Sequence, residues 1–233
     1  MLIFTSVIDN NMTLLEAISV RHSVRSYIDR PIAADVAQAL QHEIESINSE
    51  TGLHIRLILD EPRAFSSKEV FSTYGKFSGC SNYLVMAGKP SSTFDETVGY
   101  YGERLVLLAQ TLGLNSCWVG LTYKKMPELY SLEDGDKVAC VIALGYGATQ
   151  GQQHKMKDIT EISNVTESSP EWFKAGVEAV LLAPSAVNQQ KWYFELQDDQ
   201  KTVKASAKFS LIGYTKMDLG IAKLHFDLGA KLK

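Results

Sequence analysis

The chain has 233 residues, 45% of them hydrophobic and 21% charged, and its formal net charge is −4. This composition is that of a globular protein, long enough for one large domain or two small domains packed closely together. The sequence has no strongly basic stretch and no apolar run near the ~20 residues of a membrane span, which excludes nucleic-acid-binding and membrane-spanning proteins as interpretations.

The three cysteines, Cys80, Cys117 and Cys140, are far apart and odd in number. That pattern argues against a disulfide framework and favours a reducing compartment. Residues 1–11 have no basic region before their short apolar stretch, so they match a signal peptide poorly. We therefore expect a cytoplasmic protein.

Two helices are predicted near the start of the sequence. Thr13 and Glu16 have capping-box spacing, which predicts a helix over the following LLEAISV. Pro31 precedes a second predicted helix in AADVAQALQHEIESI. In that stretch, apolar residues recur at helical spacing: Val36, Leu40, Ile44 and Ile47.

A sheet is predicted from four apolar stretches, at 53–59, 81–88, 115–120 and 138–145. The last of these is continuously apolar, which favours a strand covered on both faces. A long apolar helix over 95–113, with Gly113 as its C-cap, is predicted between the second and third strands.

The second half of the chain repeats part of this pattern. After an irregular polar stretch at 146–157, Ser169 and Pro170 predict the N-cap and first turn of a helix over 171–182. The strand WYFEL and a helix over 217–230 follow. Both long helices are predicted to end in a Leu-Gly pair, Leu112-Gly113 and Leu228-Gly229. The order helix, strand, long helix thus recurs in the second half as a weak internal similarity.

The segment R-H-S-V-R, from Arg21 to Arg25, leaves the first helix. Two arginines flanking Ser23 could direct guanidinium groups and a hydroxyl at an anionic ligand. The alternative is a solvated helix end whose cations are favoured by the helix dipole.

The segment A-P-S-A-V-N-Q-Q-K-W, residues 183–192, places a proline, a hydroxyl and three side-chain amides after an apolar helix. These groups could hydrogen-bond a flat polar ligand, or they could form an ordinary Pro/Ser/Asn turn. Gly120, in C-W-V-G, either allows the backbone to approach a ligand closely or marks the end of a strand.

A glycine-rich stretch, G-Y-G-A-T-Q-G, follows the strongest predicted strand. Its spacing and the polar continuation QQHKMKD do not match a dinucleotide-binding loop. Lys155 and Lys157 could still reach a phosphate, or they could be solvated loop charges. The sequence has no H-E-x-x-H, no cysteine pair with ligand spacing and no nucleophile elbow, so we predict no metal and no catalytic triad.

Taken together, these stretches resemble the FMN-dependent nitroreductase family. The matching pieces are R-H-S-V-R-S-Y, A-P-S-A-V-N-Q-Q-K-W, G-L-N-S-C-W-V-G, and A-L-G-Y-G followed by H-K-M-K. In most of that family P-S-x-x-N closely follows R-x-S-x-R, whereas here it lies in the second half of the chain. That order resembles the single-chain branch of putative TM nitroreductases, in which one chain corresponds to a whole dimer.

The resemblance implies an α+β fold with a central, mostly antiparallel sheet flanked by helices. It also implies two related halves fused in one chain. We expect an N-terminal half over 1–163 and a shorter C-terminal half over 164–233, packed on it as one structural unit. Only the first half carries R-x-S-x-R and only the second carries P-S-x-x-N, so we expect one complete flavin site per chain.

The residues implied to hold FMN come from both halves. Arg21, Ser23 and Arg25, with His22 among them, would contact the phosphate, ribityl chain and pyrimidine edge. Lys155 and Lys157 would help hold the phosphate, and Val119 and Gly120 would present backbone to the ring edge carrying N5. The remaining residues would line the flavin from the second half: Pro184, Ser185 and Asn188, with Gln189 nearby.

The activity implied is an NAD(P)H-dependent flavin oxidoreductase with ping-pong kinetics. Its partner would be a small electron acceptor such as a nitroaromatic or quinone. No catalytic side chain is needed, because the flavin carries the chemistry. The alternatives are a non-catalytic FMN-binding or storage module and an interaction protein with a decayed site. A monomer would suffice for one site, and a homodimer stays open.

Overall fold

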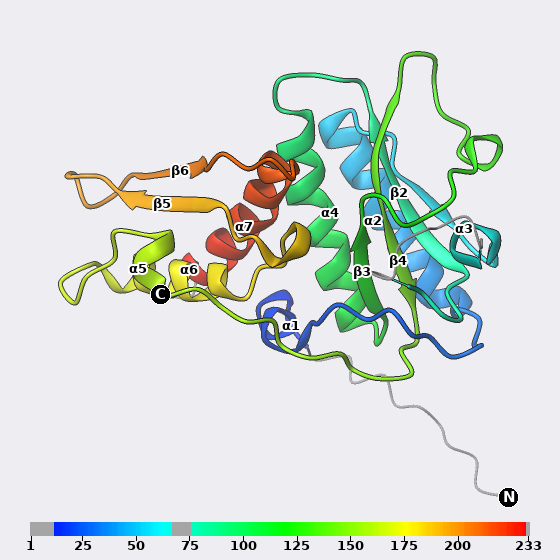
Figure 1. Ribbon diagram of the computed structural model, residues 1–233, viewed down its shortest axis with the longest axis horizontal. Coiled ribbons are helices and arrows are strands. Elements are labelled where there is room, and N and C mark those ends of the chain that lie inside the picture. Colours follow the sequence, from blue (N-terminus) through cyan, green and yellow to red (C-terminus); the bar gives the residue numbers. More distant parts are fainter. Residues whose placement is uncertain (1–11, 67–75, 232–233) are drawn as a thin grey trace, which may run out of the picture.

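The computed structural model of the protein describes residues 12–66 and 76–231 (Figure 1). The first helix, α1 (Leu14–Val20), begins with the predicted capping box. Thr13 N–H donates to Glu16 Oε2 at 2.7 Å, and Glu16 N–H donates to Thr13 Oγ1 at 3.2 Å. Two backbone donors that the helix leaves unpaired are thereby satisfied.

The central sheet has four strands: β1 (Arg56–Ile58), β2 (Asn82–Gly88), β3 (Asn115–Val119) and β4 (Lys137–Gly145). Their order is β1-β2-β4-β3, and every neighbouring pair is antiparallel. The predicted α+β class with an antiparallel sheet flanked by helices is confirmed.

Both faces of the sheet are covered, as the apolar run of β4 predicted. Ile142 of β4 points to the face packed by α2 (Ala34–Thr51) and α4 (Phe94–Thr111). Val141 points to the opposite face, where aromatic side chains and the short helices α3 (Arg63–Ser66) and η1 (Pro127–Leu129) lie. Successive residues alternate between two cores because a strand has a two-residue side-chain period.

The chain from α5 (Ile159–Ile162) onward builds a third, smaller core to the left in Figure 1. It consists of α5, α6 (Glu171–Leu181), η2 (Ala186–Asn188), the antiparallel pair β5 (Trp192–Leu196) and β6 (Val203–Ala207), and α7 (Thr215–Ala230). Four aromatic side chains lie at its centre: Phe173, Trp192, Phe194 and Phe226.

The third core meets the core beneath α2 and α4 where α4 crosses α7. Glycines allow the backbones of α4 and α7 to touch. A Cβ on Gly99 would lie 2.0 Å from Met217 O, and a Cβ on Gly220 would lie 2.0 Å from Glu96 O. Real Cβ atoms do not approach a carbonyl oxygen so closely, so both positions require glycine. Beside this crossing, Leu224 of α7 packs with Ala17 and Ile18 of α1.

Four details differ from the sequence-based expectations. The strand β6 and the short helices α3 and α5 were not predicted, because VKASA is short and contains two alanines, which are depleted in strands, and four residues are too few to show a helical period. Pro170, not Ser169, is the N-cap of α6, and Ser169 Oγ instead accepts from Thr166 N–H at 3.0 Å. Gly113 does adopt the left-handed conformation after α4, with φ +80°.

The prediction that a Leu-Gly pair ends both long helices was wrong. Gly229 lies inside α7, where it packs against Ala175 O and Ala179 Cβ of α6, whereas Gly113 follows the end of α4. The paired sequences therefore have different structural roles.

Candidate functional site

A cavity of about 670 Å³ lies where the end of α1, the end of β3, the segment after α6 and the start of α7 converge. Its walls combine charged, polar and apolar side chains. The residues that line it are Arg21, His22, Ser23, Arg25, Phe77, Trp118, Val119, Gly120, Leu121, Thr122, Cys140, Gln152, His154, Pro184, Ser185, Ala186, Val187, Asn188, Ile212, Tyr214, Met217, Asp218 and Ile221.

The structure brings most of the predicted site residues together around this cavity. Nine of them line it: Arg21, His22, Ser23, Arg25, Val119, Gly120, Pro184, Ser185 and Asn188. The other three, Lys155, Lys157 and Gln189, are not among the lining residues. Arg21 and Asn188, which lie at opposite ends of the sequence, therefore share one cavity.

The R-x-S-x-R segment is extended and runs beside β3. Val24 N–H donates to Ser116 O at 3.0 Å, and Ser23 pairs with Ser116 in an isolated parallel bridge. Within this extended segment Val24 is buried beneath the sheet, while Arg21, His22, Ser23 and Arg25 line the cavity.

Arg21 is the most buried of the charged residues that the sequence analysis selected, with 3% of its surface exposed. Its Nε lies 3.6 Å from Glu103 Oε1, and this Nε is buried without a hydrogen-bond partner. A buried guanidinium that is incompletely paired suits an anionic or carbonyl-rich ligand, because unsatisfied buried donors are costly.

The polar side chains of the 184–190 segment hold the segment itself. Ser185 Oγ accepts from Gln190 N–H at 3.0 Å. Asn188 Nδ2 donates to Lys155 O at 2.9 Å, and Asn188 Oδ1 accepts from Gln190 Nε2 at 2.8 Å. The amides that the sequence suggested for ligand binding thus have intramolecular partners, as the alternative of a turn expected, although Ser185 and Asn188 also line the cavity.

Backbone strain is concentrated in the same segment. Val187, Asn188 and Gln190 have φ angles of +46°, +57° and +45°. The left-handed region is uncommon for residues other than glycine and is a genuine outlier for a β-branched side chain such as Val187. Such strain persists only where surrounding contacts fix it, and it clusters at functional sites.

Lys157 is hydrogen-bonded to the 184–190 segment and does not line the cavity. Its Nζ donates to Gln190 O at 3.0 Å, and its N–H donates to Gln190 Oε1 at 3.1 Å. Burial and the neighbouring Lys191 lower the pKa of the Lys157 ammonium. The neighbouring Asp158 caps α5 by accepting from Thr160 N–H.

Asp218, on the first turn of α7, was not singled out from the sequence. Its oxygens accept from Ala186 N–H at 3.0 Å and from Gln189 Nε2 at 2.7 Å. Burial raises the pKa of the Asp218 carboxyl to about 6, although these two hydrogen bonds act in the opposite direction. The only sequence signal was an acid within the apolar stretch MDLGIA.

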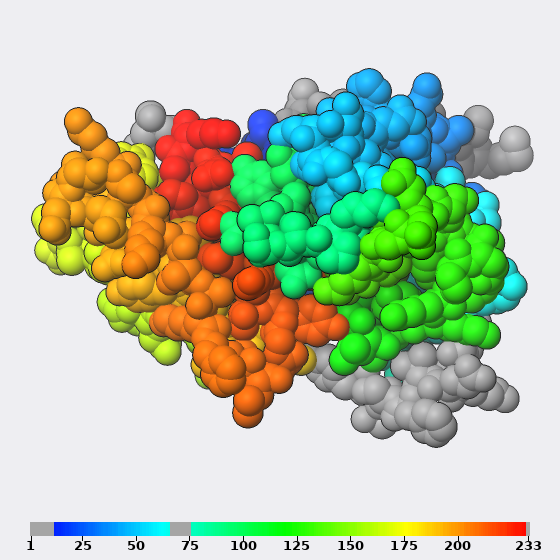
Figure 2. Space-filling view, turned by 90° about the horizontal axis from the view of Figure 1, so that it is seen from above, coloured from blue at the N-terminus to red at the C-terminus, as the bar shows by residue number. Residues whose placement is uncertain are grey.

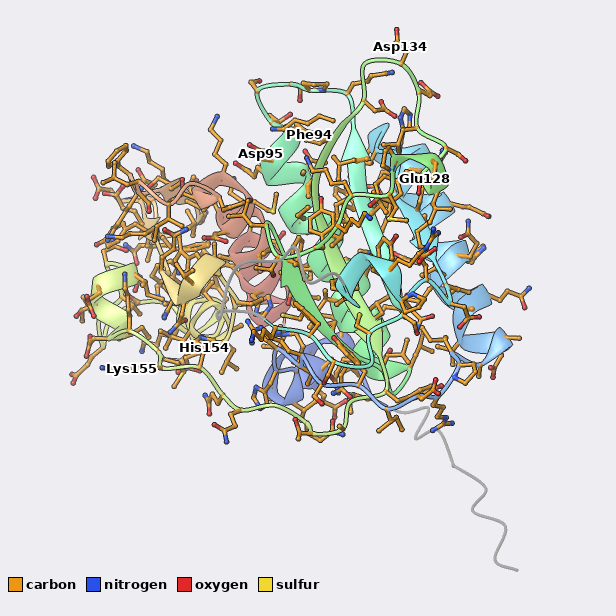
Figure 3. All side chains as sticks on the ribbon, turned by 45° about the vertical axis from the view of Figure 1, so that its right-hand side comes forward. Phe94, Asp95, Glu128, Asp134, His154 and Lys155 are labelled. Carbon is orange, nitrogen blue, oxygen red and sulfur yellow. The ribbon has the colours of Figure 1, made fainter. Side chains whose placement is uncertain are left out.

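His154 was also missed, and it precedes Lys155 on the irregular segment between β4 and α5 (Figure 3). Its Nε2 lies 3.0 Å from Leu181 O, so this nitrogen carries the proton and donates. Burial and the nearby Arg21 lower the pKa of the His154 imidazole. His154 therefore adds a neutral polar group beside the arginine.

Tyr214 fills the space over Gly120. A Cβ at Gly120 would lie 2.6 Å from Tyr214 Oη, so the close approach that this glycine permits is to a tyrosine of the α7 N-cap. Both residues line the cavity. The glycine therefore shapes the wall of the cavity from the side of β3.

The mouth of the cavity is apolar. Among the lining residues, Leu121, Val187 and Ile212 are 82%, 50% and 54% exposed. Phe209 and Leu211, close to Ile212 in the chain, are 84% and 93% exposed. The stretch that leads into α7, orange in Figure 2, projects at the lower edge of that view.

A separate cluster of possible metal ligands lies outside the cavity lining. His54, Glu133 and Asp136 place ligand atoms within 4.8 Å of one another. Lys89 Nζ lies 3.4 Å from Glu133 Oε2 and 3.2 Å from Asp136 Oδ1, so an ammonium already supplies the positive charge there. We assign no metal to this cluster.

Within the described residues, none of the helices combines the length and apolar character needed to cross a membrane. All three cysteines lie in this part of the chain and are buried free thiols.

Similarity to known proteins relates this chain to the nitroreductases. The family model described as "Putative TM nitroreductase" matches residues 13–230. No curated protein sequence matches. Among solved structures, a "putative nitroreductase" from Thermotoga maritima aligns with a TM-score of 0.63 and 23% identity, over 94% of this chain and 83% of that one.

Two further structures are similar over a shorter part of this chain. They are described as "Putative NADH dehydrogenase/NAD(P)H nitroreductase" from Parabacteroides distasonis and from Bacteroides thetaiotaomicron. Each aligns with a TM-score of 0.50 and 19% identity, over 64% of this chain and 95% of the other. At these identities the likeness establishes the fold, which is that of the nitroreductases. Because the family model covers nearly the whole chain, this protein belongs to the Putative TM nitroreductase family.

Proposed function

We propose that this protein is an FMN-dependent oxidoreductase, in which bound FMN would supply the transfer of a hydride from NAD(P)H and of electrons to a nitroaromatic, a quinone or a similar acceptor. One observation carries the proposal. Arg21, Ser23 and Arg25 from the start of the chain line the same cavity as Ser185 and Asn188 from near its end.

The character of the cavity suits FMN. Its volume of about 670 Å³ lies within the range of roughly 300–1,000 Å³ typical of small-molecule sites. Trp118, Met217 and Ile221 provide apolar surface for a planar ring. Arg21 and Arg25 provide positive charge for a phosphate or for the polar edge of the ring.

Each group of residues has a distinct task in this proposal. Arg21 and Arg25 bind negative charge on the ligand without having to reorganise, because the extended segment beside β3 fixes them. Val119 and Gly120 present backbone at the end of β3. The exposed apolar mouth leaves room for reductant and acceptor in turn, which is the requirement for ping-pong kinetics.

Lys155 and Lys157 have a smaller role in ligand binding in this proposal than the sequence resemblance implied. Neither lines the cavity, and Lys157 is hydrogen-bonded to Gln190. We propose that they shape the 184–190 segment through Lys155 O and the Lys157 ammonium.

The proposal includes one flavin site per chain, within a fused pair of related halves. The crossing of α4 and α7 supports a pseudo-twofold relationship. The Cβ of Gly99 would meet the carbonyl three residues before Gly220, and the Cβ of Gly220 would meet the carbonyl three residues before Gly99. Two equivalent helices related by a twofold axis would make this reciprocal contact.

The test is an absorbance spectrum of the purified protein reconstituted with FMN, recorded anaerobically before and after addition of NADH or NADPH. We expect about one flavin per chain, bleached by at least one reduced nicotinamide and reoxidised by a quinone. A protein that binds no FMN would refute the proposal, and nearly two FMN per chain would refute the single site.

The second candidate is a non-catalytic FMN-binding or storage module. The strained 184–190 segment, fixed by several hydrogen bonds, is compatible with a rigid binding site. Bound flavin that neither NADH nor NADPH bleaches would favour this module. Sedimentation of the loaded protein would separately decide between a monomer and a homodimer.

A further inference from the structure

A buried cluster behind the cavity wall joins four side chains from four elements. Arg21 follows α1, Glu103 lies on α4, Trp118 on β3 and His225 on α7. Glu103 and His225 are fully buried and Arg21 is nearly so. Glu103 Oε2 accepts from Trp118 Nε1 at 2.8 Å, and Glu103 Oε1 lies 3.0 Å from His225 Nε2 and 3.6 Å from Arg21 Nε.

The hydrogen-bond partners of His225 fix the number of protons in the cluster. His225 Nδ1 lies 3.1 Å from Ala179 O, and a carbonyl oxygen can only accept, so Nδ1 carries a proton. The contact between His225 Nε2 and Glu103 Oε1 needs one further proton, on either the nitrogen or the oxygen. With Arg21 always charged, the net charge of the cluster is +1 in both cases.

Glu103 also fixes Arg21. Among the described residues, Glu103 is the one carboxylate within ion-pair distance of Arg21. Asp218 lines the same cavity, but its oxygens accept from Ala186 N–H and Gln189 Nε2. His154 on the irregular segment donates to Leu181 O. Glu103 is therefore the group that holds the guanidinium in the wall of the cavity.

We propose that Glu103 and His225 share one proton in a buried pair that positions Arg21 and leaves one net positive charge beside the cavity. Glu103 is thus a positioning residue, and the cluster selects an anionic ligand. The proposal rests on the proposed function where it names FMN as that ligand. Buried and fixed, such a charge acts on the ligand more strongly than a solvated surface charge.

The first experiment needs no flavin. In ¹⁵N-histidine-labelled protein free of FMN, NMR should show His225 Nδ1 bearing a proton, with the resonance assigned by its loss in His225→Asn. In Glu103→Gln, we expect Nδ1 to keep its proton and Nε2 to carry none, because the new amide donates to Nε2. A wild-type His225 protonated at Nε2 but not at Nδ1 would overturn the proposal.

The second experiment measures the dissociation constant of FMN. Gln at position 103 can still accept from Trp118 Nε1 and donate to His225 Nε2, but its amide nitrogen faces Arg21, so the positioning of Arg21 is lost while packing is kept. We expect FMN to bind about tenfold more weakly or worse, the scale of one hydrogen bond to a charged group. The thermal unfolding midpoint should stay close to that of the wild type.

Glu96→Gln is the matched control, because Glu96 also joins α4 to α7, through an ion pair with Lys223 that does not line the cavity. This variant should bind FMN as the wild type does. Equal FMN affinity of Glu103→Gln and wild type would overturn the positioning role. A wild type that binds no FMN would instead defeat the proposed function, and the NMR experiment would still decide the shared proton.

Discussion

Gly99 of α4 and Gly220 of α7 contact the opposite helix reciprocally, each beneath a backbone carbonyl that an added Cβ would meet at 2.0 Å. Helices with larger side chains at the contact pack with axes 8–10 Å apart, and glycines permit the closest approach. The same crossing carries Met217, Asp218 and Ile221 of α7 into the cavity wall. The spacing of the two helices therefore sets the shape of the site.

Replacing either glycine should destabilise the fold. Gly99→Ala places a methyl group against Met217 O, and overpacking of this kind lowers the free energy of unfolding by about 1–3 kcal/mol. Urea unfolding measures the effect. Gln110→Ala, on the same helix, is the control and should change stability by no more than about 0.5 kcal/mol. If Gly99→Ala were stabilising by about 1 kcal/mol, as at an open helical position, the close crossing would be wrong.

Because the backbone at Val187 is strained, two polar substitutions at this position should differ in their effect on stability. Its φ of +46° costs an L-residue about 1–2 kcal/mol, and Asn tolerates this region better than a β-branched residue does. Val187→Asn should therefore unfold at a higher urea concentration than Val187→Thr, although both remove apolar character. A more stable Thr variant would show that the backbone at this position is not strained.

Asp218 should make stability depend on pH in a defined direction. Burial raises its pKa from the ordinary value of 3.8 to about 6, so the folded state binds more protons than the unfolded state between these values. The free energy of unfolding should fall as pH rises from about 4 to about 6, by on the order of 2–3 kcal/mol from this group, and then level off.

Comparison with Asp218→Asn isolates that contribution, because other groups titrate identically in both proteins. The wild type should lose stability relative to the variant over this pH range, as measured by urea unfolding at several pH values. A difference between the two proteins that stays constant from pH 4 to pH 7 would contradict the raised pKa.

Arg25→Ala should weaken FMN binding if the proposed function holds. Loss of one hydrogen bond to a charged group is worth about 1.5–3 kcal/mol, which corresponds to a rise in the dissociation constant of roughly 10- to 100-fold. Arg30→Ala is the matched control, because that guanidinium lies 3.9 Å over the Tyr146 ring and does not line the cavity. Equal FMN affinities of the two variants in a fluorescence titration would remove Arg25 from the site.

Much of the fold follows from local patterns in the sequence. Val36, Leu40, Ile44 and Ile47 share one face of α2, and all four are buried. The continuous apolar run of β4 became one of the two strands of the central sheet that are paired on both sides. These predictions succeed because the period of apolar residues and the capping of helix ends are local properties.

The contacts of the site could not be predicted in the same way. Arg21 and its partner Glu103 belong to different helical regions, and nothing local to either residue indicates the other. Asp218 and His154 were missed because an isolated acid or histidine in a sequence gives no sign of burial. Lys157 matched the family pattern, yet it is hydrogen-bonded to Gln190 outside the cavity lining.

The sequence by itself determined the main helices, the four strands of the central sheet and the two polar segments around Arg21 and Asn188, because each depends on residues close together in the chain. Only the tertiary structure decided which side chains meet in the cavity. That outcome depends on the crossing of α4 and α7, which joins distant segments through a steric fit between glycines and carbonyls that no local pattern encodes.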